Sequence, residues 1–76
     1  MEEKVLEIVT EVLIEEGDPK EVKLDSRFKE DLDFDSMRFL LLITSIEDEF
    51  NLDLIDVELE NIETVSDVIK RLEVPL

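Results

Sequence analysis

The chain has 76 residues, of which 43% are hydrophobic and 41% are charged, and its 23 acidic and 8 basic side chains give a formal net charge of −15. A chain of this length forms one domain with a modest core, since it buries roughly 60% of the surface that its unfolded form exposes. The hydrophobic content disfavours disorder, and the negative charge disfavours binding to nucleic acid or anionic membranes. We therefore expect a single domain, residues 1–76, whose partners have basic surfaces.

The sequence contains no cysteine and no histidine. The absence of cysteine excludes a disulfide framework and is compatible with a reducing compartment. The absence of histidine removes the usual general base near neutral pH. Residues 1–4 lack the basic end of a secretory signal, and no apolar run approaches membrane-spanning length. We predict a cytoplasmic protein that has no membrane span and is not itself an enzyme, and the shared negative charge favours a monomer.

The first predicted element is a helix over residues 3–16, where apolar side chains recur at helical spacing between charged positions. Gly17, followed by Asp18 and Pro19, marks its end. Residues 18–35 form a long connection, and loops of this length often carry function. We expect four spaced apolar residues to pin the connection to the core: Val22, Leu24, Phe28 and Leu32.

A second helix is predicted from Ser36, with Asp35 as its N-cap, because an aspartate accepts hydrogen bonds from the free amides of a first turn. Met37 and Leu41 lie beside the core stripe of this helix, and their spacing favours a docking surface over a core position. The stripe itself follows an amphipathic pattern: Phe39, Leu42, Ile43, Ile46 and Phe50.

The last third of the chain predicts two more helices. Residues 51–55 interrupt the helical pattern, and Val57, Leu59 and Ile62 then suit a short third helix. Thr64 and Asp67 resemble a capping box that opens a fourth, before a tail at residues 74–76. Strands are poorly supported, because no two alternating runs are joined by a tight turn. The predicted fold is all-α, a small four-helix bundle of three main helices and one short helix.

The segment 31–37 reads Asp-Leu-Asp-Phe-Asp-Ser-Met and has several interpretations. Asp35 and Ser36 are common at helix starts simply because they satisfy free backbone donors. Asp31, Asp33 and Asp35 also mimic the opening of a calcium loop, but its glycine and its bidentate glutamate are missing, so we predict no metal site. A hydrolase with paired carboxylates is disfavoured, because a domain this small has little room for a substrate cleft.

The same segment resembles the attachment signature of the acyl carrier protein family, typically Asp-Leu-Gly-x-Asp-Ser-Leu. The chain length, the acidity, Phe28, the Glu49-Phe50 helix end and the Thr64 helix start resemble that family too. The resemblance implies that a phosphopantetheinyl transferase attaches 4'-phosphopantetheine from coenzyme A to Ser36, with Asp35 positioning the serine and helping to hold the transferase's metal. The arm would carry acyl or related intermediates as thioesters between enzymes of fatty acid, polyketide or related biosynthesis.

The resemblance also implies that partner enzymes dock along the second helix. The docking residues expected here are Met37, Arg38, Leu41, Glu47, Asp48, Asp56 and Glu60. Arg38 and Leu41 stand where fatty-acid carriers usually have acidic side chains, which suggests a carrier for a dedicated pathway. Asp33 replaces the usual glycine, and aspartate tolerates a positive φ better than most residues.

Met37 in place of leucine also occurs in D-alanyl carrier proteins, so the cargo stays open between fatty acyl, polyketide, amino acyl and D-alanyl groups. The alternative function is a small acidic helical adaptor without a prosthetic group.

Overall fold

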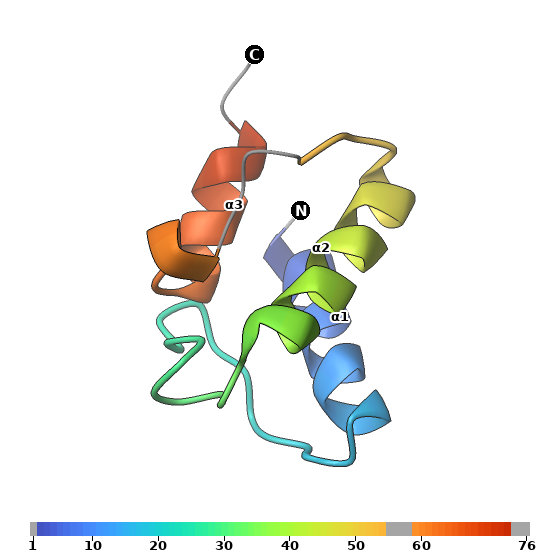
Figure 1. Ribbon diagram of the computed structural model, residues 1–76. Coiled ribbons are helices and arrows are strands. Elements are labelled where there is room, and N and C mark those ends of the chain that lie inside the picture. The colour runs from blue at the N-terminus through green and yellow to red at the C-terminus, as the bar shows by residue number, and fades with distance from the viewer. Residues whose placement is uncertain (1, 55–58, 74–76) are drawn as a thin grey trace.

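The computed structural model describes residues 2–54 and 59–73. In this part of the chain the order of elements is α1 (Glu2–Glu15), α2 (Ser36–Phe50), the 3-10 turn η1 (Leu59–Asn61) and α3 (Val65–Glu73). Helix α1 packs against both α2 and α3, and the long connection between α1 and α2 passes the lower end of α3 (Figure 1). None of the helices in the described ranges is long and apolar enough to cross a membrane. The prediction of a small all-helical fold is confirmed.

Helix α1 buries the apolar side chains that its sequence pattern predicts: Val5, Ile8, Val9, Val12 and Leu13. It ends in a Schellman motif, in which Asp18 N–H donates to the Leu13 carbonyl at 2.9 Å and Gly17 N–H to the Ile14 carbonyl at 3.0 Å. Gly17 has a φ of 74°, in the left-handed region where a side chain is strained. The predicted stop at Gly17 is therefore confirmed.

Backbone hydrogen bonds tie the long connection to the start of α3. Phe28 N–H donates to the Glu63 carbonyl at 2.9 Å, and Ser66 N–H donates to the Leu24 carbonyl at 2.9 Å. Phe28 and Leu32 are buried and Val22 is half-buried against the core, as predicted. The prediction that the Leu24 side chain is an anchor is wrong, because that side chain is 38% exposed and the tie is made by its carbonyl.

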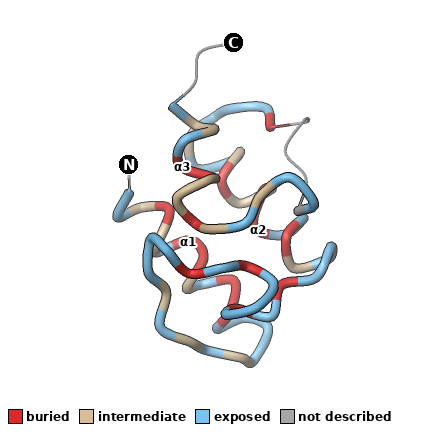
Figure 2. The backbone as a smooth tube through the Cα atoms, turned by 90° about the vertical axis from the view of Figure 1, so that its left-hand side faces the viewer, coloured by how far each residue is buried: buried red, intermediate tan, exposed pale blue. Residues whose placement is uncertain are grey.

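Helix α2 buries four of the five predicted stripe residues, and Phe50 is half-buried against the same core. Buried positions recur along each helix between exposed ones (Figure 2). Phe28 contacts two other rings edge-on, Phe34 at 5.0 Å and Phe39 at 5.5 Å between ring centroids. The loop before α2 therefore shares one core with the helices.

The predicted capping box at the start of α3 is confirmed. Asp67 N–H donates to Thr64 Oγ1 at 3.3 Å, and Thr64 N–H donates to Asp67 Oδ2 at 3.0 Å. The predicted short third helix is not confirmed, since the described residues contain only the three-residue turn η1 in that region. Val57 and the predicted tail at residues 74–76 lie outside the described residues.

Candidate functional site: a serine at the start of helix α2

Ser36 is the first residue of α2 and is exposed. Asp35 before it has the extended backbone of an N-cap, with φ −113° and ψ −176°, and its Oδ1 accepts the Arg38 N–H at 2.8 Å. The amides of Ser36 and Met37 lie in the first turn, where an α-helix offers no carbonyl partner. A phosphate bound to Ser36 would meet these amides and the positive end of a 15-residue helix.

The residues just before Asp35 hold this helix start in place. Phe34 is buried, its ring packs on Phe28, and its N–H donates to the Phe28 carbonyl at 2.8 Å. Phe34 was not among the anchors predicted from the sequence, although its spacing from the buried Leu32 and Phe28 was a usable signal. Asp33 has a φ of 55°, so the position where glycine is usual does need a left-handed backbone here.

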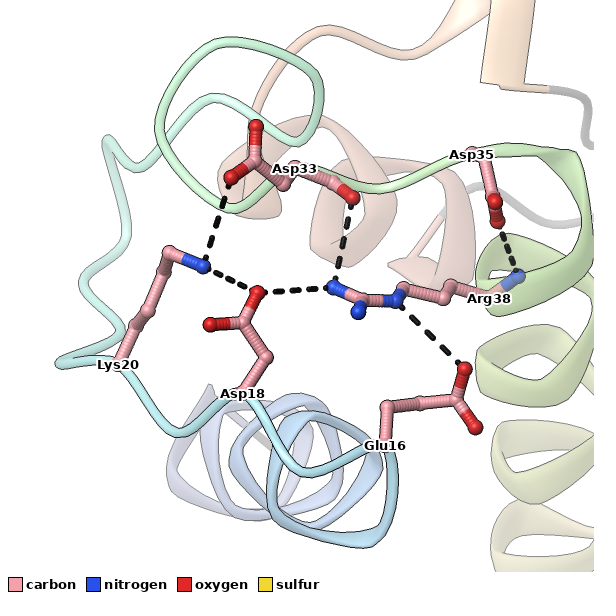
Figure 3. A network of polar contacts seen from close by, with 6 residues as sticks. All are labelled: Glu16, Asp18, Lys20, Asp33, Asp35 and Arg38. Atoms are coloured by element: carbon pink, nitrogen blue, oxygen red, sulfur yellow. Dashed lines mark hydrogen bonds and ion pairs between the residues drawn. The ribbon is translucent and has the colours of Figure 1, made fainter.

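Charged side chains from two segments surround Asp33 (Figure 3). Asp18 Oδ2 accepts from Lys20 Nζ and, at 3.2 Å, from Arg38 Nη1. Lys20 Nζ lies 3.6 Å from Asp33 Oδ2, and Arg38 Nη1 donates to the Asp33 carbonyl at 3.4 Å. The hydrogen bonds from Lys20 and then Arg38 lower the pKa of the Asp18 carboxyl below its usual value. We call these four residues, Asp18, Lys20, Asp33 and Arg38, the Asp33 ring.

The three aspartates of the calcium-like pattern have different partners. Asp31 Oδ2 accepts the Arg27 N–H at 2.8 Å, and this bond is the main reason why the pKa of Asp31 is lowered. Asp33 faces Lys20, and Asp35 caps α2 through the Arg38 N–H. Each of these three carboxylates therefore has its own structural contact, and the absence of a metal site stays a prediction.

Exposed apolar side chains lie along α2 next to Ser36. Met37 is 70% exposed and Leu41 43% exposed, so neither is a core residue, and their docking role stays a prediction. Leu40 is 65% exposed and was missed, although it follows Met37 by three residues and so shares its face.

The charged docking residues expected from the sequence are in different surroundings. Asp48 and Glu60 are exposed. The Arg38 side chain is only 19% exposed, and its Nε lies 3.6 Å from Glu16 Oε1. Glu47 Oε2 accepts the Leu54 N–H at 2.8 Å. Asp56 lies outside the described residues.

Three comparisons with known proteins agree with this architecture. Residues 3–72 match the sequence model of the PP-binding family, described as a phosphopantetheine attachment site. The chain is 38% identical over 71 residues to an acyl carrier protein of Wolinella succinogenes, a match that covers 91% of this chain and 93% of that protein. A solved structure described as an acyl carrier protein from Mycobacterium tuberculosis matches with a TM-score of 0.77 and 30% identity, over 93% of this chain and 92% of the other.

The helical fold and the family match together define a phosphopantetheine-bearing carrier domain, a class of carrier proteins rather than enzymes. The chain belongs to the acyl carrier protein family. Its cofactor is covalent 4'-phosphopantetheine. The helix start fits such a group, because it combines an exposed serine hydroxyl with first-turn amides that suit a phosphate.

Proposed function

We propose that this protein carries acyl or related intermediates on 4'-phosphopantetheine attached to Oγ of Ser36, in fatty acid, polyketide or related biosynthesis. The observation that supports it best is the exposed serine at the capped start of α2. When bound, the group supplies a thiol that holds cargo as a thioester, and a chain without cysteine has no such thiol of its own.

The protein's own residues present the hydroxyl for attachment. A phosphodiester bond forms between Ser36 Oγ and the phosphate of the arm as the pyrophosphate bond of coenzyme A breaks, the hydroxyl proton is released to solvent, and 3',5'-adenosine diphosphate departs. Asp35 caps the helix whose first-turn amides face the new phosphate. We assign Asp35 a positioning role, together with a contribution to holding the metal of the transferase.

Docking is proposed on the exposed face of α2. Met37, Leu40 and Leu41 offer apolar contact beside Ser36, and negative charge comes from Asp48 on the same helix and from Glu60 on η1. The partners would be a phosphopantetheinyl transferase and loading enzymes with basic surfaces, which a net charge of −15 attracts over a distance. The setting we propose is the cytoplasm, with which a cysteine-free chain is compatible.

The mass of the intact protein tests the attachment. The wild type is incubated with coenzyme A, magnesium and a broad-specificity phosphopantetheinyl transferase, beside Ser36→Ala and the matched control Ser45→Ala from the same helix. We expect the wild type and Ser45→Ala each to gain one phosphopantetheine and Ser36→Ala to gain none, with the same circular dichroism in all three. A folded wild type that gains nothing with several transferases would favour the acidic adaptor instead.

A further inference from the structure

Arg38 lies on α2, the helix that we propose for docking, yet its guanidinium already makes contacts with other residues of the same chain. Nη1 contacts both Asp18 Oδ2, at 3.2 Å, and the Asp33 carbonyl, at 3.4 Å, while Nε lies 3.6 Å from Glu16 Oε1. With only 19% of its side chain exposed, Arg38 joins the end of α1 to the start of α2 (Figure 3). A partner that used this guanidinium would have to break contacts that are already made.

The contacts among the four residues of the Asp33 ring form a closed cycle. Lys20 reaches the carboxylate of Asp33, Arg38 reaches its carbonyl, and Asp18 joins Lys20 to Arg38. Asp33 is therefore held at its side chain and at its backbone, and its φ of 55° costs aspartate less than most residues but more than glycine. These contacts favour the left-handed conformation over the alternatives that the free chain would prefer.

Arg38 also holds the other side of the same turn. Its backbone N–H binds the Asp35 carboxylate, while its guanidinium binds the Asp33 carbonyl, so one residue fixes both neighbours of the buried Phe34. Ser36 follows directly after this clamped segment. A shift of the turn would move the serine hydroxyl relative to the helix start that presents it.

We propose that Arg38 is a positioning residue, which acts through the Asp33 ring to fix the turn before Ser36 and so orients the serine for modification. This inference rests on the proposed attachment at Ser36. It assigns Arg38 an intramolecular role in place of a direct contact with partner enzymes. Individual surface ion pairs contribute little to global stability, so the ring acts on local order more than on the stability of the whole fold.

Two single variants and their combination test the ring. Arg38→Met removes the guanidinium and keeps an apolar stem, and Asp18→Asn removes the charge that joins Lys20 to Arg38 from another segment of the chain. Lys70→Met and Asp25→Asn remove the same kinds of charge at exposed positions outside the ring and serve as matched controls.

The first measurement is amide hydrogen exchange by NMR on the unmodified protein. We expect the Phe34 amide, which is hydrogen-bonded to the Phe28 carbonyl, to exchange about tenfold faster in Arg38→Met and in Asp18→Asn, and at the wild-type rate in both controls. Unchanged exchange in the two ring variants would overturn the inference. This measurement needs no transferase, so it stands even if the proposed attachment at Ser36 fails.

The second measurement is the kinetics of the transferase with the carrier as varied substrate. A misplaced hydroxyl lowers kcat by about tenfold with KM for the carrier nearly unchanged. Asp18→Asn should reproduce the effect of Arg38→Met, and the double variant should be no worse than either single one, because all three break the same ring.

A raised KM in Arg38→Met with wild-type kinetics in Asp18→Asn would instead make Arg38 a docking residue and overturn the positioning role. A wild type that is never modified would refute the proposed attachment itself. The exchange rates would then test only whether Arg38 and Asp18 order the turn before Ser36.

Discussion

Asp33 shows how one residue can replace the glycine that its position favours. The backbone there is left-handed, with φ 55°, and aspartate visits this region more often than most residues that have a side chain, though less readily than glycine. The added side chain is also used, since its carboxylate faces Lys20. The strain at this residue is thus offset by contacts that glycine lacks.

Two substitutions at Asp33 separate the cost of the left-handed backbone from the contribution of the ion pair with Lys20. Asp33→Ala and Asp33→Gly both lose the ion pair with Lys20, so the difference between them reports the backbone alone. We expect the free energy of unfolding, measured in urea, to be about 1 kcal/mol lower for Asp33→Ala than for Asp33→Gly. Equal values for the two variants would mean that the turn does not need a left-handed residue.

At the scale of a helix, the ends of α1 and α3 are set by short local motifs. Gly17 closes α1 with a φ of 74°, and a Cβ at this position would meet no atom within 4 Å, so only the backbone conformation opposes a side chain. Thr64 and Asp67 satisfy each other's amides at the start of α3. Both ends depend on residues within one turn of the helix terminus.

Substitution at Gly17 tests the first of these motifs. Gly17→Ala should lower the free energy of unfolding by about 1 kcal/mol, because alanine is strained at this φ although it has room. Gly17→Asn is the matched variant and should lose less, since asparagine tolerates the left-handed region. Urea unfolding of the three proteins measures this, and an alanine variant as stable as the wild type would contradict it.

The capping box predicts a pH dependence. The pKa of Asp67 is lowered from 3.8, mainly because its carboxylate accepts the Thr64 N–H, with a further bond from Glu63. The charged form therefore stabilises the fold above the unfolded pKa, and this contribution is lost as the pH falls through the lower, folded pKa.

We expect Asp67→Ala to lower the free energy of unfolding by about 1 kcal/mol at neutral pH. The difference in the free energy of unfolding between Asp67→Ala and the wild type should become smaller as the pH falls below about 4. Urea titrations over a pH series measure both effects, with the exposed Asp25→Ala as control. A gap that stays constant with pH would show that the charge of Asp67 does not matter.

For the whole molecule, the net charge of −15 opposes folding through repulsion between carboxylates. The described ion pairs, such as those of Lys4 with Glu7 and Glu49, are on the surface and individually weak. Salt screens both the repulsion between carboxylates and the attraction within ion pairs. With 23 acidic and 8 basic side chains, we expect the total repulsion to exceed the total attraction.

Raising sodium chloride from about 10 mM to about 500 mM should therefore raise Tm, on the order of 5 °C. Circular dichroism melts measure this, and potassium chloride should have the same effect if screening rather than specific binding is responsible. A Tm that falls with salt would mean that the ion pairs outweigh the repulsion.

The features that could be predicted from the order of amino acids alone are those whose signals lie within a few residues of each other. Apolar spacing predicted the buried faces of α1 and α2, Gly17 predicted the end of α1, and Asp35 predicted the cap beside Ser36. These predictions succeed because helical periodicity and capping depend on neighbours within about one turn.

Contacts between residues from different segments of the chain could be seen only in the tertiary structure. Arg38 carries no local signal that it reaches Asp18 and Glu16, and Leu24 looked like an anchor although its side chain is exposed. Such contacts depend on how the end of α1 lies against the start of α2 and how the connection passes α3. Packing of the whole core fixes these relations, and no short stretch of sequence contains them.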